Sequence, residues 1–272
     1  METLFLFGVN LLAVLLFMCA GWIISLIRKN AAIADSFWGL GFVLIVWLTF
    51  FQADGYFWRQ LLLLLLATTW GVRLFIHIST RSRGKGEDPR YAAWRKEYGE
   101  RFWIVSLYRV FLVQALFLWV IALGLQWGQI PEYPAHLTWL DAAGVLIWIA
   151  GFTTETVADY QLRAFLSDPA NKGRVMDRGL WRYSRHPNYF GESLVWWGIF
   201  VIVLSVPWGI LTVISPLLIT YTLLRLTGVS LMEQTEFSDN PEYQAYIERT
   251  SAFIPWLPKS KRKEHNDKKK QP

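Results

Sequence analysis

The side chains best suited to chemistry lie in one stretch, residues 179–192. It reads G-L-W-R-Y-S-R-H-P-N-Y-F-G-E, and it stands directly before a long apolar run. Ionisable groups at a membrane boundary are costly unless a partner or a ligand satisfies them. A chain that only crosses a bilayer does not need this density of hydrogen-bonding groups. We therefore predict that the stretch forms the rim of a ligand site.

Four arginines precede or belong to this stretch, namely Arg174, Arg178, Arg182 and Arg185. Guanidinium groups bind phosphate oxygens bidentately and stay charged. NADPH carries a pyrophosphate and a 2′-phosphate, whereas S-adenosylmethionine carries no phosphate, so the arginines favour NADPH. Cytoplasmic loops of membrane proteins are basic in any case, and that alternative accounts for part of the cluster. No G-x-G-x-x-G follows a strand, so a Rossmann domain is not expected.

Residues 142–166 form an apolar segment that carries three ionisable side chains. Glu155, Asp159 and Arg163 are spaced four residues apart, so they share one face of a helix. They either form a salt-bridged stripe between helices or line a cavity that holds water or a ligand. Asp159 and Arg163 also lead directly toward the arginine-rich segment, so one nucleotide could contact both.

The motif R-H-P-N-Y-F-G-E places further polar groups at a helix start. Pro187 suits the first helical turn, and Asn188, Tyr189 and Glu192 then lie within about one turn. Glu192 could accept a hydrogen bond from a carboxamide or a ribose hydroxyl, or it could stabilise the helix start. His186 has no second His or Cys at ligand spacing, so we expect no metal there and a contact with phosphate or substrate instead.

Two candidates for proton transfer lie in the first half of the chain. Asp35, in the motif D-S-F-W-G, stands at the mouth of an apolar helix. A desolvated carboxyl there would keep its proton, as a general acid requires; the alternative is that Asp35 caps the helix. Tyr91 ends a glycine-rich loop, residues 83–91, and it could either donate a proton or serve only in packing.

The elements that must position these residues are membrane helices. Of the 272 residues, 54% are hydrophobic and only 18% are charged, which indicates a polytopic membrane protein. Runs long enough to span a bilayer, about 20 residues, cover 4–27, 36–53, 60–80, 110–130 and 142–166. The run 189–231 crosses twice if residues 205–209 form a turn. We therefore predict an all-α bundle of about seven transmembrane helices.

The loops predict the orientation. Lysine and arginine concentrate after the first, third, fifth and seventh predicted helices, and the opposite loops hold only Arg59. The positive-inside rule then places the amino terminus outside and the carboxyl terminus in the cytoplasm. We expect residues 1–258 to form a single integral membrane domain, with the cofactor site in 139–258. Residues 259–272 are predicted to be a disordered basic tail that binds no nucleic acid, because it lacks interleaved aromatics.

Several segments together resemble a known family. Residues 35–39, 83–91, 159–163 and 180–192 are similar to the largely bacterial, uncharacterised branch of the steroid 5-alpha-reductase-like membrane proteins. The motif R-H-P-N-Y-x-G-E is also similar to one in sterol reductases, and a shorter form, R-H-P-x-Y-x-G, occurs in isoprenylcysteine carboxyl methyltransferases. Those methyltransferases share a downstream pattern, represented here by Glu233, Glu236, Tyr243, Tyr246 and Pro255. The motif therefore defines a superfamily and leaves the reaction open.

The reductase resemblance implies NADPH held between helices on the cytoplasmic side of a bacterial inner membrane. It implies hydride transfer to the β-carbon of an enone and proton delivery to the α-carbon. The matching cofactor positions are Asp159, Arg163, Arg174, Asn188, Tyr189 and Glu192, and our candidate set adds Arg182, Arg185 and His186. The candidate catalytic residues are Asp35, Tyr91 and Glu192. Steroid reductases use a Gln-Glu pair in helix 2 and a Tyr in helix 3, whereas Asp35 has no Gln beside it and the third predicted helix has no Tyr.

Three hypotheses follow. The leading one is an NADPH-dependent reductase of a conjugated carbon–carbon double bond in a steroid-like or other lipid. The second is an S-adenosylmethionine-dependent methyltransferase acting on a lipid-linked acceptor. The third is a lipid-binding membrane scaffold without catalysis. In the first two, the partners are membrane lipids and a lipid-like small molecule.

Overall fold

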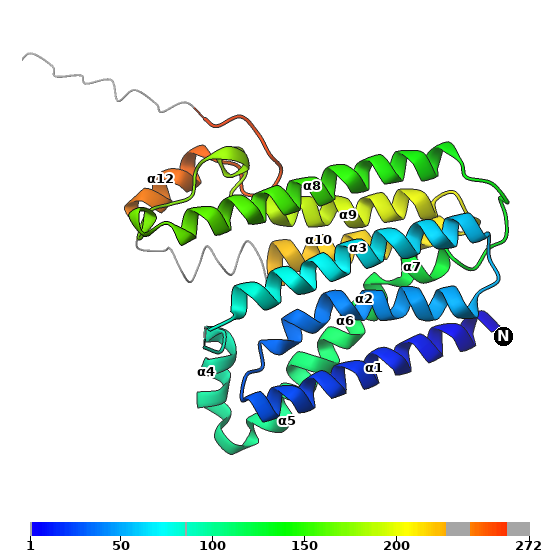
Figure 1. Ribbon diagram of the computed structural model, residues 1–272, viewed down its shortest axis with the longest axis horizontal. Coiled ribbons are helices and arrows are strands. Elements are labelled where there is room, and N and C mark those ends of the chain that lie inside the picture. Colours follow the sequence, from blue (N-terminus) through cyan, green and yellow to red (C-terminus); the bar gives the residue numbers. More distant parts are fainter. Residues whose placement is uncertain (1, 85, 227–239, 260–272) are drawn as a thin grey trace, which may run out of the picture. The chain divides into compact units, whose positions relative to one another are not determined.

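The computed structural model describes residues 2–84, 86–226 and 240–259, and within these ranges it contains helices and no β-strand (Figure 1). The prediction of an all-α protein is confirmed. The helices fall into two compact units. The first comprises Met1–Ile149 and Leu194–Thr220, and the second comprises Ala150–Ser193 and Tyr221–Pro272. The tail predicted to be disordered lies outside the described residues, apart from Lys259.

The first unit contains the amino-terminal helices. They are α1 (Glu2–Arg28), α2 (Ile33–Gln52), α3 (Phe57–Ser82), α4 (Pro89–Tyr98), α5 (Phe102–Ser106), α6 (Val113–Ile121) and α7 (Leu123–Trp127). Short 3₁₀ and π turns, Gly99–Arg101 and Leu107–Leu112, join α4, α5 and α6. The unit also includes the start of α8 (Trp139–Ser167), the end of α9 (Pro187–Val203), the 3₁₀ turn Gly209–Val213 and most of α10 (Ile214–Tyr221).

Six helical segments of the described chain are long and apolar enough to cross a membrane, as expected of an integral membrane protein. They are Glu2–Arg28, Ile33–Gln52, Phe57–Ser82, Pro89–Ile121, Trp139–Ser167 and Gly209–Leu226. Each of the six corresponds to a predicted crossing: five to the first five runs, and Gly209–Leu226 to the second half of the run 189–231. The first half of that run corresponds to α9, which has 17 residues. The predicted fourth run, 110–130, overlaps the helical segment Pro89–Ile121, which begins earlier, and α7 continues over Leu123–Trp127.

Two glycines explain how α2 and α3 pack side by side (Figure 1). A Cβ atom on Gly39 would lie 2.5 Å from the carbonyl oxygen of Gly71, and a Cβ on Gly71 would lie 2.5 Å from the carbonyl oxygen of Gly39. Only residues without a side chain allow the two backbones to approach this closely. Gly39 belongs to the D-S-F-W-G motif, so part of that motif serves helix packing. It fixes α2 against α3 one helical turn after Asp35.

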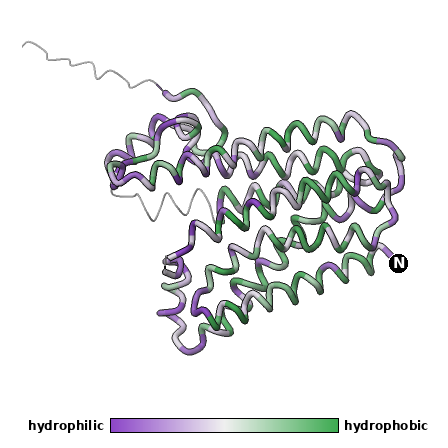
Figure 2. Tube along the Cα trace, viewed as in Figure 1, coloured by the Kyte–Doolittle hydropathy of each residue, from purple (hydrophilic) through white to green (hydrophobic). Residues whose placement is uncertain are grey.

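Aromatic side chains fill the core of the first unit. Phe42, Trp70 and Trp196 are almost completely buried. Their ring centroids lie 4.6 Å apart between Phe42 and Trp196 and 5.3 Å apart between Trp70 and Trp196. Aromatic pairs at such distances add to the stabilisation that burial alone provides. Apolar residues run along α1, α2 and α3, while α4 is mainly polar (Figure 2).

The second unit contains the remaining parts of α8 and α9, together with α12 (Pro241–Arg249) and the 3₁₀ turn η4 (Gly179–Arg182). Asn240 caps α12, because its Oδ1 accepts a hydrogen bond from the Glu242 N–H at 2.9 Å. Tyr243 and Tyr246 on α12 are buried with Val175. The two tyrosines of the downstream pattern therefore lie on a helix, Pro241–Arg249, whereas Glu233 and Glu236 lie outside the described residues.

Candidate functional site

The acidic face of α8 and the start of α9 meet in the second unit. The Asn188 Nδ2 donates a hydrogen bond to Asp159 Oδ1 at 3.3 Å. Asp159 is 7% exposed, Glu155 2% and Glu192 8%, so three carboxyl groups are buried on these two helices. We call Glu155, Asp159, Asn188 and Glu192 the α8–α9 cluster. The sequence predicted that Asp159, Asn188 and Glu192 belong to one site, and the structure places all three within the same compact unit.

The glycine of the motif explains this close approach. A Cβ atom on Gly191 would lie 2.5 Å from the backbone nitrogen of Glu155 and 2.7 Å from the carbonyl oxygen of Gly151. Any larger residue would push α9 away from α8. Because Gly191 lies three residues after Asn188 on α9, this close approach brings Asn188 against α8, where it bonds Asp159.

The turn before α9 is fastened to α8 as well. The Gln161 Oε1 accepts a hydrogen bond from the Leu180 N–H at 3.0 Å, and the Trp181 Nε1 donates to the Ala158 carbonyl oxygen at 3.0 Å. These bonds attach η4 to Ala158 and Gln161, which lie next to Asp159 and two residues after it on α8. The turn that leads into α9 is therefore held in place against α8, as the support of a binding site requires.

One acceptor in the cluster has no protein partner. The Oδ1 atom of Asn188 is buried, and it accepts no hydrogen bond from the residues that the structure describes. Buried polar atoms are paired in the great majority of cases, so an exception calls for an explanation such as a ligand. Beside it, the rings of His186 and Tyr189 stack at 5.5 Å with an interplanar angle of 7°. The cluster can therefore accept hydrogen bonds from a polar guest.

The predicted arginines have three different environments. Arg163 and Arg174 are exposed to solvent. Arg182 is also exposed, and it lines a pocket to which none of the α8–α9 cluster contributes. Arg185 is buried, and its Nη1 donates to the carbonyl oxygens of Ile247 at 3.0 Å and Thr250 at 2.7 Å. Arg185 thus holds the carboxyl end of α12, and its role in binding a cofactor stays a prediction.

Asp35 and Tyr91, the predicted proton-transfer residues, contact each other in the first unit. The Tyr91 hydroxyl donates to Asp35 Oδ1 at 3.2 Å, and the Gln114 Nε2 donates to the same oxygen at 3.4 Å. The Nη2 of Arg90 lies 3.8 Å from Asp35 Oδ2. We call these four residues the Asp35 cluster. Asp35 does not cap α2, because the N-cap position is Ala32 and no side chain hydrogen-bonds there.

Two details of this cluster differ from the sequence prediction. Tyr91 was expected at the end of a loop, but it lies in the first turn of α4, which Asp88 caps through a 2.9 Å hydrogen bond from the Arg90 N–H. Burial raises the pKa of the Asp88 carboxyl, but the hydrogen bonds from Arg90 outweigh this and lower the pKa below its usual value. Gln114 was not predicted; a lone amide within an apolar run was the available signal.

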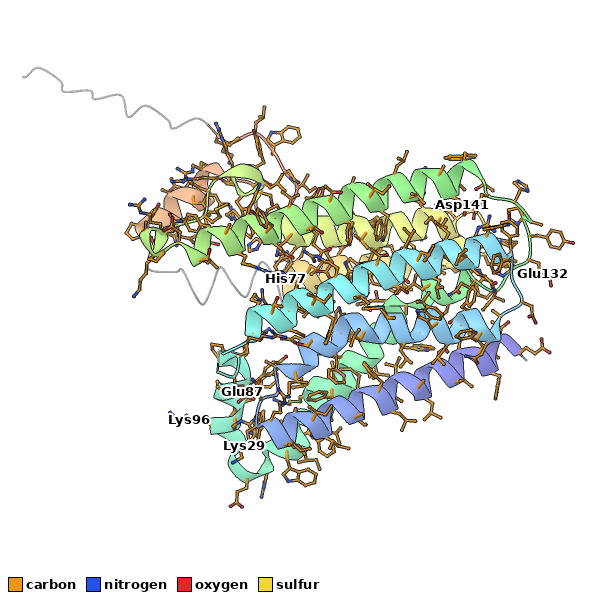
Figure 3. The ribbon with its side chains drawn as sticks, viewed as in Figure 1. Lys29, His77, Glu87, Lys96, Glu132 and Asp141 are labelled. Atoms are coloured by element: carbon orange, nitrogen blue, oxygen red, sulfur yellow. The ribbon has the colours of Figure 1, made fainter. Side chains whose placement is uncertain are left out.

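The loop before α4 is locked by Glu87. Its carboxylate accepts from Arg95 Nε and Nη2, each at 2.8 Å, and from the Ala31 N–H at 2.7 Å. Burial raises the pKa of Glu87, yet the Arg95 and Ala31 hydrogen bonds lower it more, so that the pKa lies below its usual value. Glu87 and Lys29 lie at the same end of the first unit (Figure 3). The lock fixes α4, and with it Tyr91, against the turn between α1 and α2.

Within the described residues, no group of three His, Cys, Asp or Glu side chains is placed to hold a metal ion.

Residues 21–250 match the family model "Protein of unknown function (DUF1295)". The chain belongs to the DUF1295 family. It is 27% identical to "Uncharacterized protein C594.04c" of Schizosaccharomyces pombe, in an alignment that covers 87% of this chain and 76% of the relative. No solved structure matches it.

Proposed function

We propose that this DUF1295 protein is a membrane-embedded, NADPH-dependent reductase of a conjugated carbon–carbon double bond in a steroid-like or other lipid. The family includes steroid 5-alpha-reductase-like proteins. The observation that carries the proposal is the α8–α9 cluster, in which Asn188 Oδ1 is buried and has no hydrogen-bond partner among the described residues, while the Asn188 amide bonds the buried Asp159. A ligand that carries hydrogen-bond donors would supply the partner that this buried acceptor otherwise lacks.

The residues of the second unit fit the groups that NADPH presents. Its ribose hydroxyls and carboxamide are hydrogen-bond donors, and Asp159, Asn188 Oδ1 and Glu192 are acceptors. Arg163 and Arg174 are exposed, so they are available to its phosphates. Tyr189, stacked on His186, offers an aromatic face. When bound, NADPH supplies a hydride.

The chain itself must supply the proton and polarise the acceptor. Reduction of an enone adds a hydride to the β-carbon and a proton to the α-carbon, while negative charge develops on the carbonyl oxygen. We assign carbonyl hydrogen bonding and proton delivery to the Asp35–Tyr91 pair. Gln114 replaces the glutamine that the sequence lacks beside Asp35, because its amide reaches the same carboxylate from another helix.

The proposal includes seven membrane crossings, with the amino terminus outside and the cofactor residues facing the cytoplasm. Helix α9 supplies the seventh crossing. Its 17 residues extend about 26 Å, close to the hydrocarbon thickness of about 30 Å. The lysine and arginine bias of the loops supports the orientation. A bacterial inner membrane is the proposed location.

The direct test is binding of NADPH to the purified full-length protein in detergent. We expect NADPH fluorescence to change saturably as the nucleotide binds. The affinity should fall about tenfold in Asn188→Ala, since a hydrogen bond to the ligand is lost. Tyr160→Phe is the matched control, because Tyr160 adjoins Asp159 in the sequence but is 71% exposed. The proposal is wrong if NADPH does not bind while S-adenosylmethionine does.

A second function has one specific observation in its favour. Arg185 is engaged by the carbonyl oxygens of Ile247 and Thr250, which reduces the arginines available to phosphate. S-adenosylmethionine needs none, and the R-H-P-x-Y-x-G motif occurs in isoprenylcysteine carboxyl methyltransferases. Transfer of a radiolabelled methyl group to lipid acceptors would favour the methyltransferase, and enone-dependent oxidation of NADPH would favour the reductase.

A further inference from the structure

The segment that follows α12, residues 251–258, is firmly held within the second unit. The Ser251 carbonyl oxygen accepts from the Arg185 N–H at 2.8 Å, and the Phe253 carbonyl oxygen accepts from the Ser184 hydroxyl at 2.7 Å. The Trp256 N–H donates to the Tyr183 carbonyl oxygen at 2.9 Å. The backbone of this segment therefore has a defined path along residues 183–185, directly before α9.

The same segment presents large apolar side chains to its surroundings. Ile254 is 62% exposed, Trp256 73% and Leu257 76%. Single exposed apolar residues are common, but three within four positions, on a segment fixed by hydrogen bonds, form a patch that needs a partner. Tryptophan is enriched where membrane proteins meet the bilayer interface. We call Ile254, Trp256 and Leu257 the apolar patch.

A basic pocket adjoins this patch. It has a volume of about 440 Å³ and is lined by Asp177, Arg178, Gly179, Arg182, Arg249, Thr250 and Pro258. Pro258 directly follows Leu257, so the patch continues into the pocket wall. Three arginines against one carboxylate give the lining a net charge of +2.

Two of the three arginines are available to a ligand. Arg249 donates to Asp177 and lies over the ring of Tyr246 at 5.8 Å. Arg178 and Arg182 are exposed, and their guanidinium groups form no hydrogen bond or ion pair with the described residues. Guanidinium groups bind phosphate oxygens strongly and in pairs. The pocket therefore suits one phosphate group.

The position of the pocket within its unit indicates where that phosphate comes from. Arg182 ends η4, which is attached to Ala158 and Gln161 near the end of the membrane-crossing segment Trp139–Ser167. Phospholipid phosphates lie at this boundary, and basic pockets beside membrane helices bind anionic headgroups. A free phosphate or a nucleotide would have no use for the neighbouring apolar patch.

We propose that the apolar patch inserts into the bilayer interface and that the Arg178–Arg182–Arg249 pocket binds the phosphate of an anionic phospholipid. The site is separate from the α8–α9 cluster, and it does not depend on which reaction the protein catalyses. The lipid would fix the segment after α12 to the membrane surface, while Arg185 fixes it to the start of α9.

The first test is native mass spectrometry of the full chain with added phosphatidylglycerol or phosphatidylcholine of equal chain length. We expect a preference for phosphatidylglycerol that weakens at least about tenfold in the double variant Arg178→Gln, Arg182→Gln. The control removes two exposed charges elsewhere, Lys96→Gln with Lys172→Gln, and should retain the preference. Equal affinity for both lipids, or displacement by inorganic phosphate at the same concentration, would overturn the proposal.

The second test examines the apolar patch, and its result does not depend on whether the pocket binds a phospholipid. The chain has one cysteine, Cys19, so a Cys19→Ser background allows a single environment-sensitive fluorophore at Leu257→Cys. In nanodiscs we expect blue-shifted emission that lipid-attached quenchers reduce, whereas a fluorophore at Lys172→Cys should emit as in water. Water-like emission at position 257 would contradict insertion.

Discussion

Two polar clusters at opposite ends of the first unit show how differently buried charge can be treated. Asp141 and Glu87 mark these ends (Figure 3). At the first, Arg59 and Asp141 form a salt bridge of 2.8 Å, and the two residues are 0% and 2% exposed. At the second, Asp35 binds Tyr91 and Gln114, and its side chain remains 32% exposed.

Arg59 and Asp141 each form further hydrogen bonds within the protein besides the salt bridge that joins them. Arg59 also donates to the carbonyl oxygens of Pro134 at 3.2 Å and His136 at 2.9 Å. Asp141 Oδ2 accepts from the backbone N–H of Thr138 at 2.7 Å and from its hydroxyl at 2.8 Å. Both side chains are almost completely buried, and most of their hydrogen-bonding groups are already paired within the protein, so this pair is structural.

The Asp35 cluster is open by the same measure. Gln114 Oε1 is buried and has no hydrogen-bond partner among the described residues. Arg90 lies 3.8 Å from Asp35 but makes its short contact, 2.8 Å, with Asp88. The partly exposed Asp35 side chain and the unpaired Gln114 Oε1 can still form hydrogen bonds with a guest, a capacity that a purely structural cluster would not need. The two clusters both contain an acid and an arginine. They differ in how many of their hydrogen-bonding groups are already paired within the protein.

The largest effect we expect is on stability, at the Arg59–Asp141 pair. Asp141→Asn removes the charge that balances Arg59 and leaves a buried, uncompensated cation. Breaking a buried pair in this way costs about 3–5 kcal/mol. Thermal unfolding in detergent should show a fall in Tm of at least about 6 °C.

Two further variants make that result specific. Asp54→Asn removes a carboxylate from the loop before α3, where Asp54 is exposed, and its Tm should not change. The double variant Arg59→Met, Asp141→Leu should recover much of the loss, because replacing a whole buried pair is often neutral. If Asp141→Asn unfolds like the parent protein, the Arg59–Asp141 pair does not have the structural role that we assign to it.

The open cluster should show the reverse pattern, with a loss of turnover and little loss of stability. Tyr91→Phe removes the hydroxyl that we assign to proton delivery, and general acid catalysis contributes at least about 10²-fold to rate. The measurement is NADPH oxidation with a 4-en-3-one steroid as test substrate. Because Asp35 keeps solvent contact and Gln114, the free energy of unfolding should fall by only about 1 kcal/mol.

Tyr98→Phe is the matched control on the same helix, since Tyr98 bonds Arg109 and has no contact with Asp35. It should retain full turnover. A Tyr91→Phe protein that is strongly destabilised but turns over normally would place the Asp35 cluster with the structural pairs and remove the contrast.

The sequence was sufficient for residues whose role depends on local spacing. Asp159 and Glu155 share a helix face because they are four residues apart, and Asn188 and Glu192 follow Pro187 at a helix start. Both features need only helical periodicity and the conformational preference of proline. The all-α class follows equally directly, because apolar runs of membrane length form helices.

Long-range pairing could not be predicted. Gln114 meets Asp35 across 79 residues, and Arg185 meets the Thr250 carbonyl oxygen across 65. A basic residue before a membrane helix has the same sequence signature whether it binds phosphate or a backbone carbonyl group. Arg59 is the one Lys or Arg in the predicted loops opposite the basic ones, but its partner Asp141 lies 82 residues away. Partners of this kind emerge only when the helices are packed.

The smallest effect we expect concerns Glu87, whose ion pair with Arg95 is intermediate between the two clusters. The pKa of Glu87 is lowered below its usual value of 4.5 in the folded protein, against the effect of burial, by hydrogen bonds from Arg95 and the Ala31 N–H. The stabilisation is therefore complete above pH about 4.5 and is lost as the pH falls through the folded-state pKa. Arg95 is 38% exposed, so solvent limits the contribution to about 1 kcal/mol.

Unfolding followed between pH 3 and pH 7, about the range over which a carboxyl titrates, should show this stabilisation in the parent protein and its loss in Glu87→Gln. Glu97→Gln provides the control, because Glu97 is an exposed glutamate on α4, the helix that carries Arg95. If Glu87→Gln also lowers turnover at pH 7, the Glu87–Arg95 ion pair serves to position Tyr91 on α4, and Glu87 belongs with the reactive cluster rather than with the structural pairs. An unchanged turnover would confine the reactive part to the Asp35 cluster itself.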